Sequence, residues 1–314
     1  MKMRNKKNIK CKMKKQNTIL SMAMKSRLMM IGLSFIISCI PFAASSQKPS
    51  NPAGAQKQLT ILHTNDTHSC ILPLNANLAD TTLAGRGGYL RRIAMLKEER
   101  AKNPNLLLFD SGDFSQGSSY YTMFKGDVEI GLMNLMHYDA ATIGNHEFDF
   151  GLDNMVRLFK MANFPIVCSN YDFGETELAK IVKPYIVIKR NGLKLGIFAL
   201  CPELEGLVTK ANYGPLKYLN PTECAQKMIH LLKNELKCDA VICLSHLGWK
   251  TTDFPCDRVI RETRGLDLVL DGHSHTYLHQ LEYVKDLDGK LVPVDQNGKH
   301  AAFIGKLQLK FEKR

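Results

Sequence analysis

Five short apolar segments of this chain are each followed at once by Asp, Asn or His side chains. The segments are continuous apolar runs of strand length, which is typical of strands covered on both faces. In an α/β sheet the carboxyl ends of the strands form one rim, so polar loops from different strands can converge there. The pattern therefore predicts an α/β fold with a polar site at one edge. The polar clusters are Asn65-Asp66-Thr67-His68, Gly112-Asp113, Gly144-Asn145-His146-Glu147-Phe148-Asp149, Ser245-His246 and Gly272-His273-Ser274-His275.

Helical patterns alternate with these strands. Helices are expected at residues 152–162 and 221–236, the second with Asn220 as N-cap, Pro221 at its first position and Glu223 three residues after the cap. Asn191-Gly192 and Asn297-Gly298 predict two hairpins, which pair 185–190 with 193–200 and 292–294 with 301–311. The alternation predicts layered, mixed sheets, closed by the last hairpin. Strands are expected at residues 59–63, 105–109, 140–143, 164–168, 193–200, 240–244 and 268–270.

The number of polar side chains indicates a metal centre with more than one ion. Asp, His and Asn are ligand types for hard or borderline divalent metals. Seven ligands exceed the needs of one tetrahedral zinc but suit two metals about 3.5–4 Å apart that share a carboxylate. Such a pair activates water and neutralises phosphoryl oxygens, which predicts hydrolysis of a phosphate ester. The candidate ligands are Asp66, His68, Asp113, Asn145, His246, His273 and His275.

The order of these motifs resembles the calcineurin-like metallophosphoesterases, and LHTNDTHS with GNHEFDFG is similar to their 5′-nucleotidase branch. The resemblance extends over residues 59–311 and implies an α/β/β/α sandwich with mixed sheets. It also implies that His146 is the catalytic histidine, that Asp149 orients it, and that Glu147 is structural. The first metal would be held by Asp66, His68, Asp113 and His275, and the second by Asp113, Asn145, His246 and His273.

The resemblance implies a substrate class and leaves alternatives open. The expected reaction converts a nucleoside monophosphate into a nucleoside and phosphate, with two divalent ions (Zn, Mn, Co or Fe) and no other cofactor. A phosphodiesterase acting on 2′,3′-cyclic nucleotides or nucleotide sugars is the alternative. Many nucleotidases of this branch have Gln or Asn where His275 stands. Full-length members continue into a nucleotide-binding domain, which is expected to be absent here, so a separate polypeptide with that role is a further alternative.

The net charge of +12 is concentrated at the N-terminus. Ten basic residues lie between Lys2 and Arg27, and the rest of the chain has 32 basic against 30 acidic residues. A nucleic-acid partner is therefore not expected. An apolar run at 28–40, followed by small residues, predicts a signal peptide at 1–45, a linker at 46–58 and a catalytic domain at 59–314. Export to the periplasm or cell surface follows, and lipidation at Cys39 would add a membrane anchor. An uncleaved N-terminal anchor helix is the alternative.

Other polar and aromatic residues are expected outside the ligand set. His63 is expected to pack or to support a ligand. His137, His230, His279 and His300 lie outside the motifs and are expected at the surface. Trp249 is expected to line the site or to fill the core, and Tyr120-Tyr121 to contact substrate or to pack beneath a loop. The seven cysteines after the leader form no CxxC motif and are expected to be buried, reduced thiols.

Overall fold

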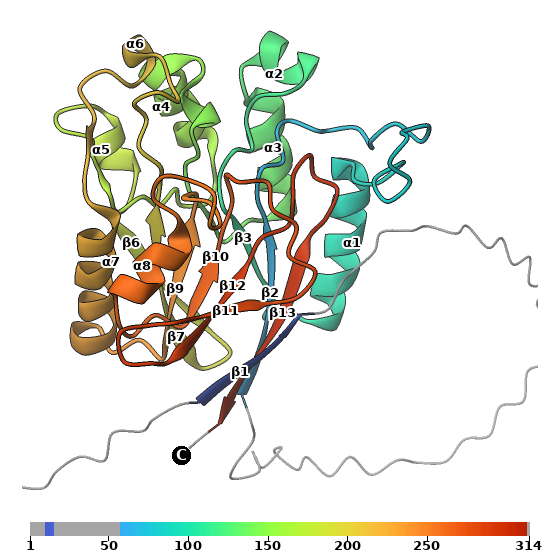
Figure 1. The fold of residues 1–314 in the computed structure, drawn as a ribbon. Helices are drawn as coiled ribbons and strands as arrows, with labels where there is room; N and C mark the ends of the chain where they lie inside the picture. Colours follow the sequence, from blue (N-terminus) through green and yellow to red (C-terminus); the bar gives the residue numbers. More distant parts are fainter. Residues whose placement is uncertain (1–9, 16–56, 313–314) are drawn as a thin grey trace, which may run out of the picture.

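Two β-sheets face each other in the computed structural model, which describes residues 10–15 and 57–312 (Figure 1). The five-stranded sheet has the order β1 (Lys10–Lys15), β13 (Gly305–Glu312), β2 (Lys57–Thr64), β3 (Leu107–Asp110) and β4 (Ala140–Ala141). The six-stranded sheet has the order β11 (Glu282–Lys285), β12 (Leu291–Asp295), β10 (Leu268–Leu270), β9 (Ala240–Ser245), β7 (Leu193–Leu200) and β6 (Tyr185–Arg190). A small third sheet pairs β5 (Tyr171–Asp172) with β8 (Lys217–Tyr218).

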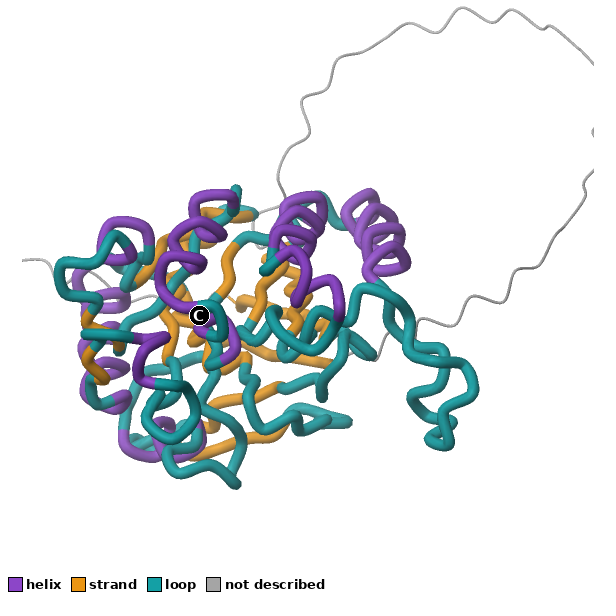
Figure 2. The backbone as a smooth tube through the Cα atoms, turned by 90° about the horizontal axis from the view of Figure 1, so that it is seen from above, coloured by secondary structure: helices purple, strands orange, loops and turns teal. Residues whose placement is uncertain are grey.

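Helices cover the outer face of each large sheet, and Figure 2 shows them outside the strands. The core between the two sheets holds residues such as Ile61 of β2 and Ile242 of β9. Neighbouring positions point outward: Leu62 packs beneath α1, α3 and α4, and Val241 packs beneath α7 and α8. The expected α/β/β/α sandwich is confirmed. The helices are α1 (Tyr89–Lys102), α2 (Ser119–Phe124), α3 (Asp127–Met136), α4 (Gly151–Met161), α5 (Leu178–Ile181), α6 (Lys210–Tyr213), α7 (Pro221–His230) and α8 (Cys256–Glu262).

Parallel strands bring the polar loops to one end of the sandwich. β2, β3 and β4 run parallel, as do β7, β9 and β10 in the other sheet. Their carboxyl ends lie at the upper end in Figure 1. The expected strand at 164–168 is wrong, because Ile166 bridges Ala141 whereas Val167 bridges Lys183. The segment changes partner within one residue and forms no ladder.

The first expected hairpin is confirmed and the second is wrong. β6 and β7 pair antiparallel around Asn191 and Gly192. β12, however, belongs to the six-stranded sheet and β13 to the five-stranded sheet, so the chain crosses between sheets at 296–304. The Asn297 backbone N–H donates to Asn65 Oδ1 (2.9 Å), and the Gly298 N–H donates to the Thr276 carbonyl (2.9 Å). These bonds hold Asn297-Gly298 against other loops, and β12 pairs instead with β11.

The helix expected at 221–236 begins as predicted and changes form near its end. Asn220 Oδ1 accepts hydrogen bonds from the backbone N–H groups of Thr222 (2.9 Å) and Glu223 (3.1 Å). α7 ends at His230, and a π-helical segment (Leu231–Glu235) continues it. Leu232 of this segment is buried where Gly196 of β7 has no side chain.

Part of the N-terminal region is described. β1 lies within the expected signal peptide and pairs antiparallel with β13, and Lys15 Nζ lies 2.5 Å from Asp295 Oδ1. β2 begins at Lys57, two residues before the expected start of the catalytic domain. The expected apolar run of the leader lies outside the described residues, so the leader assignment stays a prediction. Within residues 10–15 and 57–312, no helix is long and apolar enough to cross a membrane.

Candidate metal centre

The loop after β2 carries Asp66 and His68 and is fastened to two neighbouring loops. The backbone N–H of Asp66 donates to the Gly112 carbonyl (2.9 Å), and that of His68 donates to the Asp113 carbonyl (3.0 Å). Both Asp66 oxygens lie 3.0 Å from the backbone nitrogen of His273, which donates to them. Loops after β2, β3 and β10 are therefore locked together by hydrogen bonds, as parallel strands with adjacent carboxyl ends allow.

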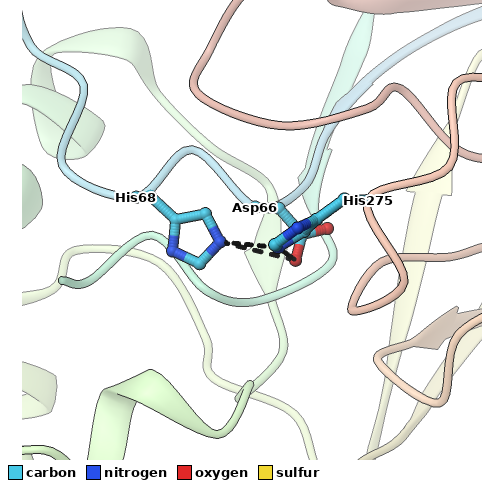
Figure 3. Close-up of side chains that lie close together, drawn as sticks. All are labelled: Asp66, His68 and His275. Atoms are coloured by element: carbon cyan, nitrogen blue, oxygen red, sulfur yellow. Dashed lines mark hydrogen bonds and ion pairs between the residues drawn. The ribbon is translucent and has the colours of Figure 1, made fainter. Parts of the chain in front are cut away.

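Three side chains from two of these loops form a first cluster (Figure 3). His68 Nε2 and His275 Nε2 lie 2.9 Å apart. Asp66 Oδ1 lies 3.9 Å from His68 Nε2 and 3.5 Å from His275 Nε2. Two ring nitrogens that face each other beside a carboxylate oxygen form a donor set suited to a divalent cation.

Asp113, His246 and His273 form a second cluster. His246 Nδ1 lies 2.6 Å from the Ser111 carbonyl, and an N–H donated there leaves Nε2 with a free lone pair. That Nε2 lies 3.2 Å from Asp113 Oδ2. Asn145 lies between Gly144 and His146, which both approach the Asp113 carboxylate, and its buried Oδ1 has no hydrogen-bond partner among the described residues. A buried amide oxygen without a partner is costly, and a cation would satisfy it.

Asp113 of the second cluster also faces His68 of the first cluster. Its Oδ2 is 3.2 Å from His246 Nε2 and 4.0 Å from His68 Nε2. The backbone of Asp113 is left-handed (φ 55°). Its carboxylate packs so closely on Gly144 that a Cβ added to Gly144 would lie 2.1 Å from Asp113 Oδ1. Only glycine leaves room for the carboxylate at this point.

Glu147 holds the backbone around Asp113. Its fully buried carboxylate accepts hydrogen bonds from the backbone N–H groups of Asp113 (2.9 Å), Ser115 (3.0 Å) and Gly144 (2.6 Å). Charge-assisted hydrogen bonds of this kind are stronger than neutral ones. Glu147 therefore connects the loops after β3 and β4.

His146 stands at the open side of the centre. Its Nδ1 lies 3.2 Å from each Asp149 oxygen, and both side chains are 32% exposed. The His146 backbone N–H donates to Asp113 Oδ1 (2.9 Å), and its ring lies 5.4 Å from the ring of His68. His146 is thus close to both clusters and still accessible to a substrate.

Burial opposes the charge of His246, but the Asp113 carboxylate beside it raises the pKa of His246 well above its usual value. For three other histidines of the centre, burial sets the protonation. It lowers the pKa of His68, His273 and His275 to about 4, so these rings are neutral near pH 7 and can act as ligands. Burial also raises the pKa of Asp66 well above its usual value. Burial opposes the charge of Asp113, but His246 beside it holds the pKa of Asp113 well below its usual value. The neutral rings and buried carboxylates fit cation ligands.

The structure brings all seven expected ligands and the pair His146 and Asp149 to one site. Of the residues expected outside the ligand set, some are buried away from the centre and others lie beside His68. His63 is buried against Asp295 (Nε2 to Oδ2, 3.0 Å), and Trp249 is buried in the core beneath α7 and α8. Tyr120 lines a groove beside His68. His300 was expected at the surface, but its half-buried ring lies 5.9 Å from the ring of His68.

Gln296 supports the centre and was not identified from the sequence. Its Nε2 donates to Asp271 Oδ2 and to the Gly272 carbonyl, both at 2.8 Å. Its Oε1 lies 3.2 Å from Ser274 Oγ. Gln296 therefore fixes the loop that carries His273 and His275. The one available signal is its place two residues after the strand run at 292–294.

Comparison with known proteins agrees with this geometry. The family model for calcineurin-like phosphoesterases matches residues 59–277. The chain belongs to the calcineurin-like phosphoesterase family. It is 30% identical over 275 residues to a 5′-nucleotidase of Diplobatis ommata, covering 82% of this chain and 46% of that one. It is also 30% identical over 283 residues to the human 5′-nucleotidase, covering 84% and 48%. The chain spans about half the length of these curated relatives.

Solved structures show the same family likeness. A 5′-nucleotidase precursor from Thermus thermophilus superposes with a TM-score of 0.72 at 30% identity, over 81% of this chain and 54% of that one. The calcineurin-like phosphoesterase YfkN from Bacillus subtilis superposes with a TM-score of 0.67 at 27% identity, over 83% and 87%.

Proposed function

We propose that this chain hydrolyses phosphate esters with two divalent cations, and that nucleoside 5′-monophosphates are its preferred substrates. The observation that carries the proposal is that Asp113 of the second cluster also faces His68 of the first cluster. The family match and the 5′-nucleotidase relatives support the reaction class and the substrate.

The residues present fit two cations. The first cluster offers Asp66, His68 and His275, and the second offers His246, His273 and the unpartnered Asn145 Oδ1. Asp113 would contribute to both. When bound, the two ions would supply Lewis-acid chemistry, because divalent ions polarise phosphoryl oxygens and make water a stronger nucleophile. Asp, His and Asn bind several divalent ions. Metal analysis of the purified protein would identify which of Zn, Mn, Co and Fe it holds.

His146 would act on the phosphoryl group. Asp149 faces Nδ1 of the ring, so an N–H donated to Asp149 orients Nε2 toward the substrate. From there His146 would stabilise charge on the phosphoryl oxygens or donate a proton to the departing oxygen. Asp149 acts through His146 and is a positioning residue.

The first experiment tests the reaction. The full chain supplied with Mn²⁺, Zn²⁺ or Co²⁺ should retain two metal ions per chain and hydrolyse 4-nitrophenyl phosphate. Asn145→Ala should lose metal and activity, whereas His146→Ala should lose activity and keep its metal. His230→Ala, on the exposed face of α7, is the matched control. Full activity in both centre variants would rule out the mechanism.

The second experiment tests the substrate. AMP should be hydrolysed with a higher kcat/KM than UDP-glucose or 2′,3′-cyclic AMP. A preference for either diester would replace the monoesterase proposal with the phosphodiesterase alternative.

Two further proposals concern the cellular setting. We propose that the chain is exported, with cleavage in the small-residue cluster before residue 46 or lipidation at Cys39. N-terminal sequencing and mass measurement of the protein recovered from its native cells would distinguish these outcomes.

We also propose that another domain or polypeptide contributes to nucleotide selection, because the curated relatives are about twice as long. Affinity capture with the metal-loaded chain should recover such a polypeptide, and AMP selectivity in its absence would argue against it.

A further inference from the structure

The segment at 297–301 reaches the metal centre although it contributes none of the expected ligands. His300 and Ala301 both have left-handed backbones (φ 58° and 57°). Left-handed non-glycine residues are uncommon, and they persist where surrounding contacts determine the backbone. The same conformation occurs in Asp66, His68, Asp113, His273 and His275. His300 therefore shares a backbone feature with five of the seven expected ligands.

Hydrogen bonds hold this segment against the loop that carries Asp66. The His300 backbone N–H donates to the Asp66 carbonyl (2.8 Å). Asn65 Nδ2 donates to the Gly298 carbonyl (2.8 Å). Behind the segment, the buried Arg92 donates from Nη2 to the Ala301 carbonyl (3.1 Å). The position of His300 is thus fixed relative to the centre by contacts on both sides.

The His300 ring faces the first cluster. It lies edge-on to His68, with ring centroids 5.9 Å apart, and both rings line a groove of about 370 Å³. Within the described residues, His300 is in neither cluster and in no other group of side chains that could hold a metal. It is therefore placed to contact a molecule bound at the centre instead of the metal itself.

Lys299 adds a positive charge at the same place. Its side chain is exposed. Burial, and after it the charge of Lys299, lowers the pKa of His275 to about 4 and also lowers the pKa of His300. Lys299 directly precedes His300, so its charge stands on the segment whose next residue lines the groove beside His68.

We propose that Lys299 and His300 bind the non-bridging oxygens of a phosphate dianion at the His68 side of the centre, so that the site favours phosphate monoesters over diesters. This inference rests on the proposed function. Monoesters are largely dianionic near pH 7 because their second pKa is about 6, whereas diesters have only one ionised oxygen. An added cation attracts the dianion more strongly. A histidine ring nitrogen can donate one further hydrogen bond.

The test measures phosphate binding apart from turnover. Lys299→Gln removes the charge, and His300→Asn removes the ring while keeping a residue that tolerates the left-handed backbone. The controls are Lys237→Gln and His137→Asn, exposed residues that are not among those lining the groove. His137 matches His300 in its left-handed backbone (φ 55°). Isothermal titration of inorganic phosphate into each Mn²⁺-loaded full chain should show affinity about tenfold weaker in the two site variants and unchanged in the controls.

A kinetic comparison tests the preference for monoesters. The ratio of kcat/KM for 4-nitrophenyl phosphate to that for bis(4-nitrophenyl) phosphate should fall about tenfold in Lys299→Gln. Metal content should stay equal to that of the wild type. Phosphate affinity within twofold of the wild type in both site variants would overturn this inference, and so would equal losses on the two esters. A wild-type chain that binds metal and phosphate but hydrolyses no ester would overturn the proposed function and leave this inference intact.

Discussion

Glu147 is the residue on which the backbone of the centre most depends. Three backbone N–H groups, from the loops after β3 and β4, donate to its carboxylate. The resemblance implied a structural role, and the geometry specifies it: Glu147 holds Asp113 in a left-handed backbone.

Glu147→Gln should therefore destabilise the protein and weaken metal binding together. Glutamine keeps one acceptor oxygen and turns an N–H₂ toward backbone donors, so at least one buried N–H loses its partner at a cost of about 1–3 kcal/mol. Urea unfolding and titration with Mn²⁺ would measure both effects. Glu175→Gln, at an exposed position, is the control. Equal unfolding free energies for the Glu147 variant and the wild type would contradict this role.

Asp149→Asn should lower kcat and leave KM nearly unchanged. The carboxylate orients the His146 ring and, among the described residues, belongs to no group of side chains that could hold a metal. We expect a loss of about tenfold to a hundredfold in kcat, at or below the usual contribution of a general acid. Steady-state kinetics on 4-nitrophenyl phosphate would measure it, with the exposed Asp153→Asn as control. If Asp149 acts through His146, the double variant with His146→Ala should be no slower than His146→Ala alone.

At the scale of elements, turn chemistry predicted one hairpin correctly and failed at the other. Asn191-Gly192 joins β6 to β7 because both strands lie in one sheet and pair along their whole length. Asn297-Gly298 has the same residues, but its hydrogen bonds go to Asn65 and Thr276. Local turn preference does not encode these long-range hydrogen bonds, and β12 and β13 lie in different sheets.

Two cysteines meet behind the centre where the segment after β4 packs against the end of β7. Cys168 Sγ lies 3.4 Å from Cys201 Sγ, and both residues are buried. The Asn170 side chain makes two hydrogen bonds with the backbone of Cys201. Its Oδ1 accepts from the Cys201 N–H, and its Nδ2 donates to the Cys201 carbonyl (both 2.8 Å). All seven cysteines of residues 57–312 are free thiols, and five of them are buried as expected, whereas Cys70 and Cys224 are only partly buried. Their sequence spacing did not indicate that Cys168 and Cys201 are in contact.

Treatment with diamide should link Cys168 to Cys201. The two thiols would lose two protons and two electrons to diamide, which is reduced to the hydrazine, and one S–S bond would form. Because both thiols are buried, the reaction should proceed as slowly as local opening exposes them. Peptide mapping after alkylation would identify the linked pair, and Cys168→Ser should abolish the link. A different linked pair, or none after prolonged oxidation, would contradict the expectation.

At the scale of the whole molecule, the centre joins the two halves of the sandwich. Asp66, Asp113 and Asn145 follow strands of one sheet, whereas His246, His273 and His275 follow strands of the other. Each donor cluster combines ligands from both sheets. Bound cations would thus connect the sheets at their carboxyl ends.

Chelation should therefore lower the melting temperature. Without cations, two fully buried carboxylates lack the charge that compensates their burial. A ligand present at a hundred times its Kd stabilises by about 2.7 kcal/mol, so Mn²⁺-loaded and EDTA-treated samples should differ measurably. Differential scanning fluorimetry would record the shift, and His246→Ala should reduce it. The same melting temperature with Mn²⁺ and with EDTA would argue against a metal that bridges the sheets.

The sequence by itself determined the residue types of the centre, their order along the strands, the α/β class, the Asn220 cap and the first hairpin. These depend on local preferences and hydrophobic periodicity, which adjacent residues encode. The family resemblance already implied how the ligands divide between two metals. Only the tertiary structure decided that Glu147 accepts hydrogen bonds from three backbone N–H groups and that His300 faces His68. The contact that redirects the 297–301 segment joins residues 232 positions apart. Such pairings depend on how the two sheets pack, and no local pattern specifies them.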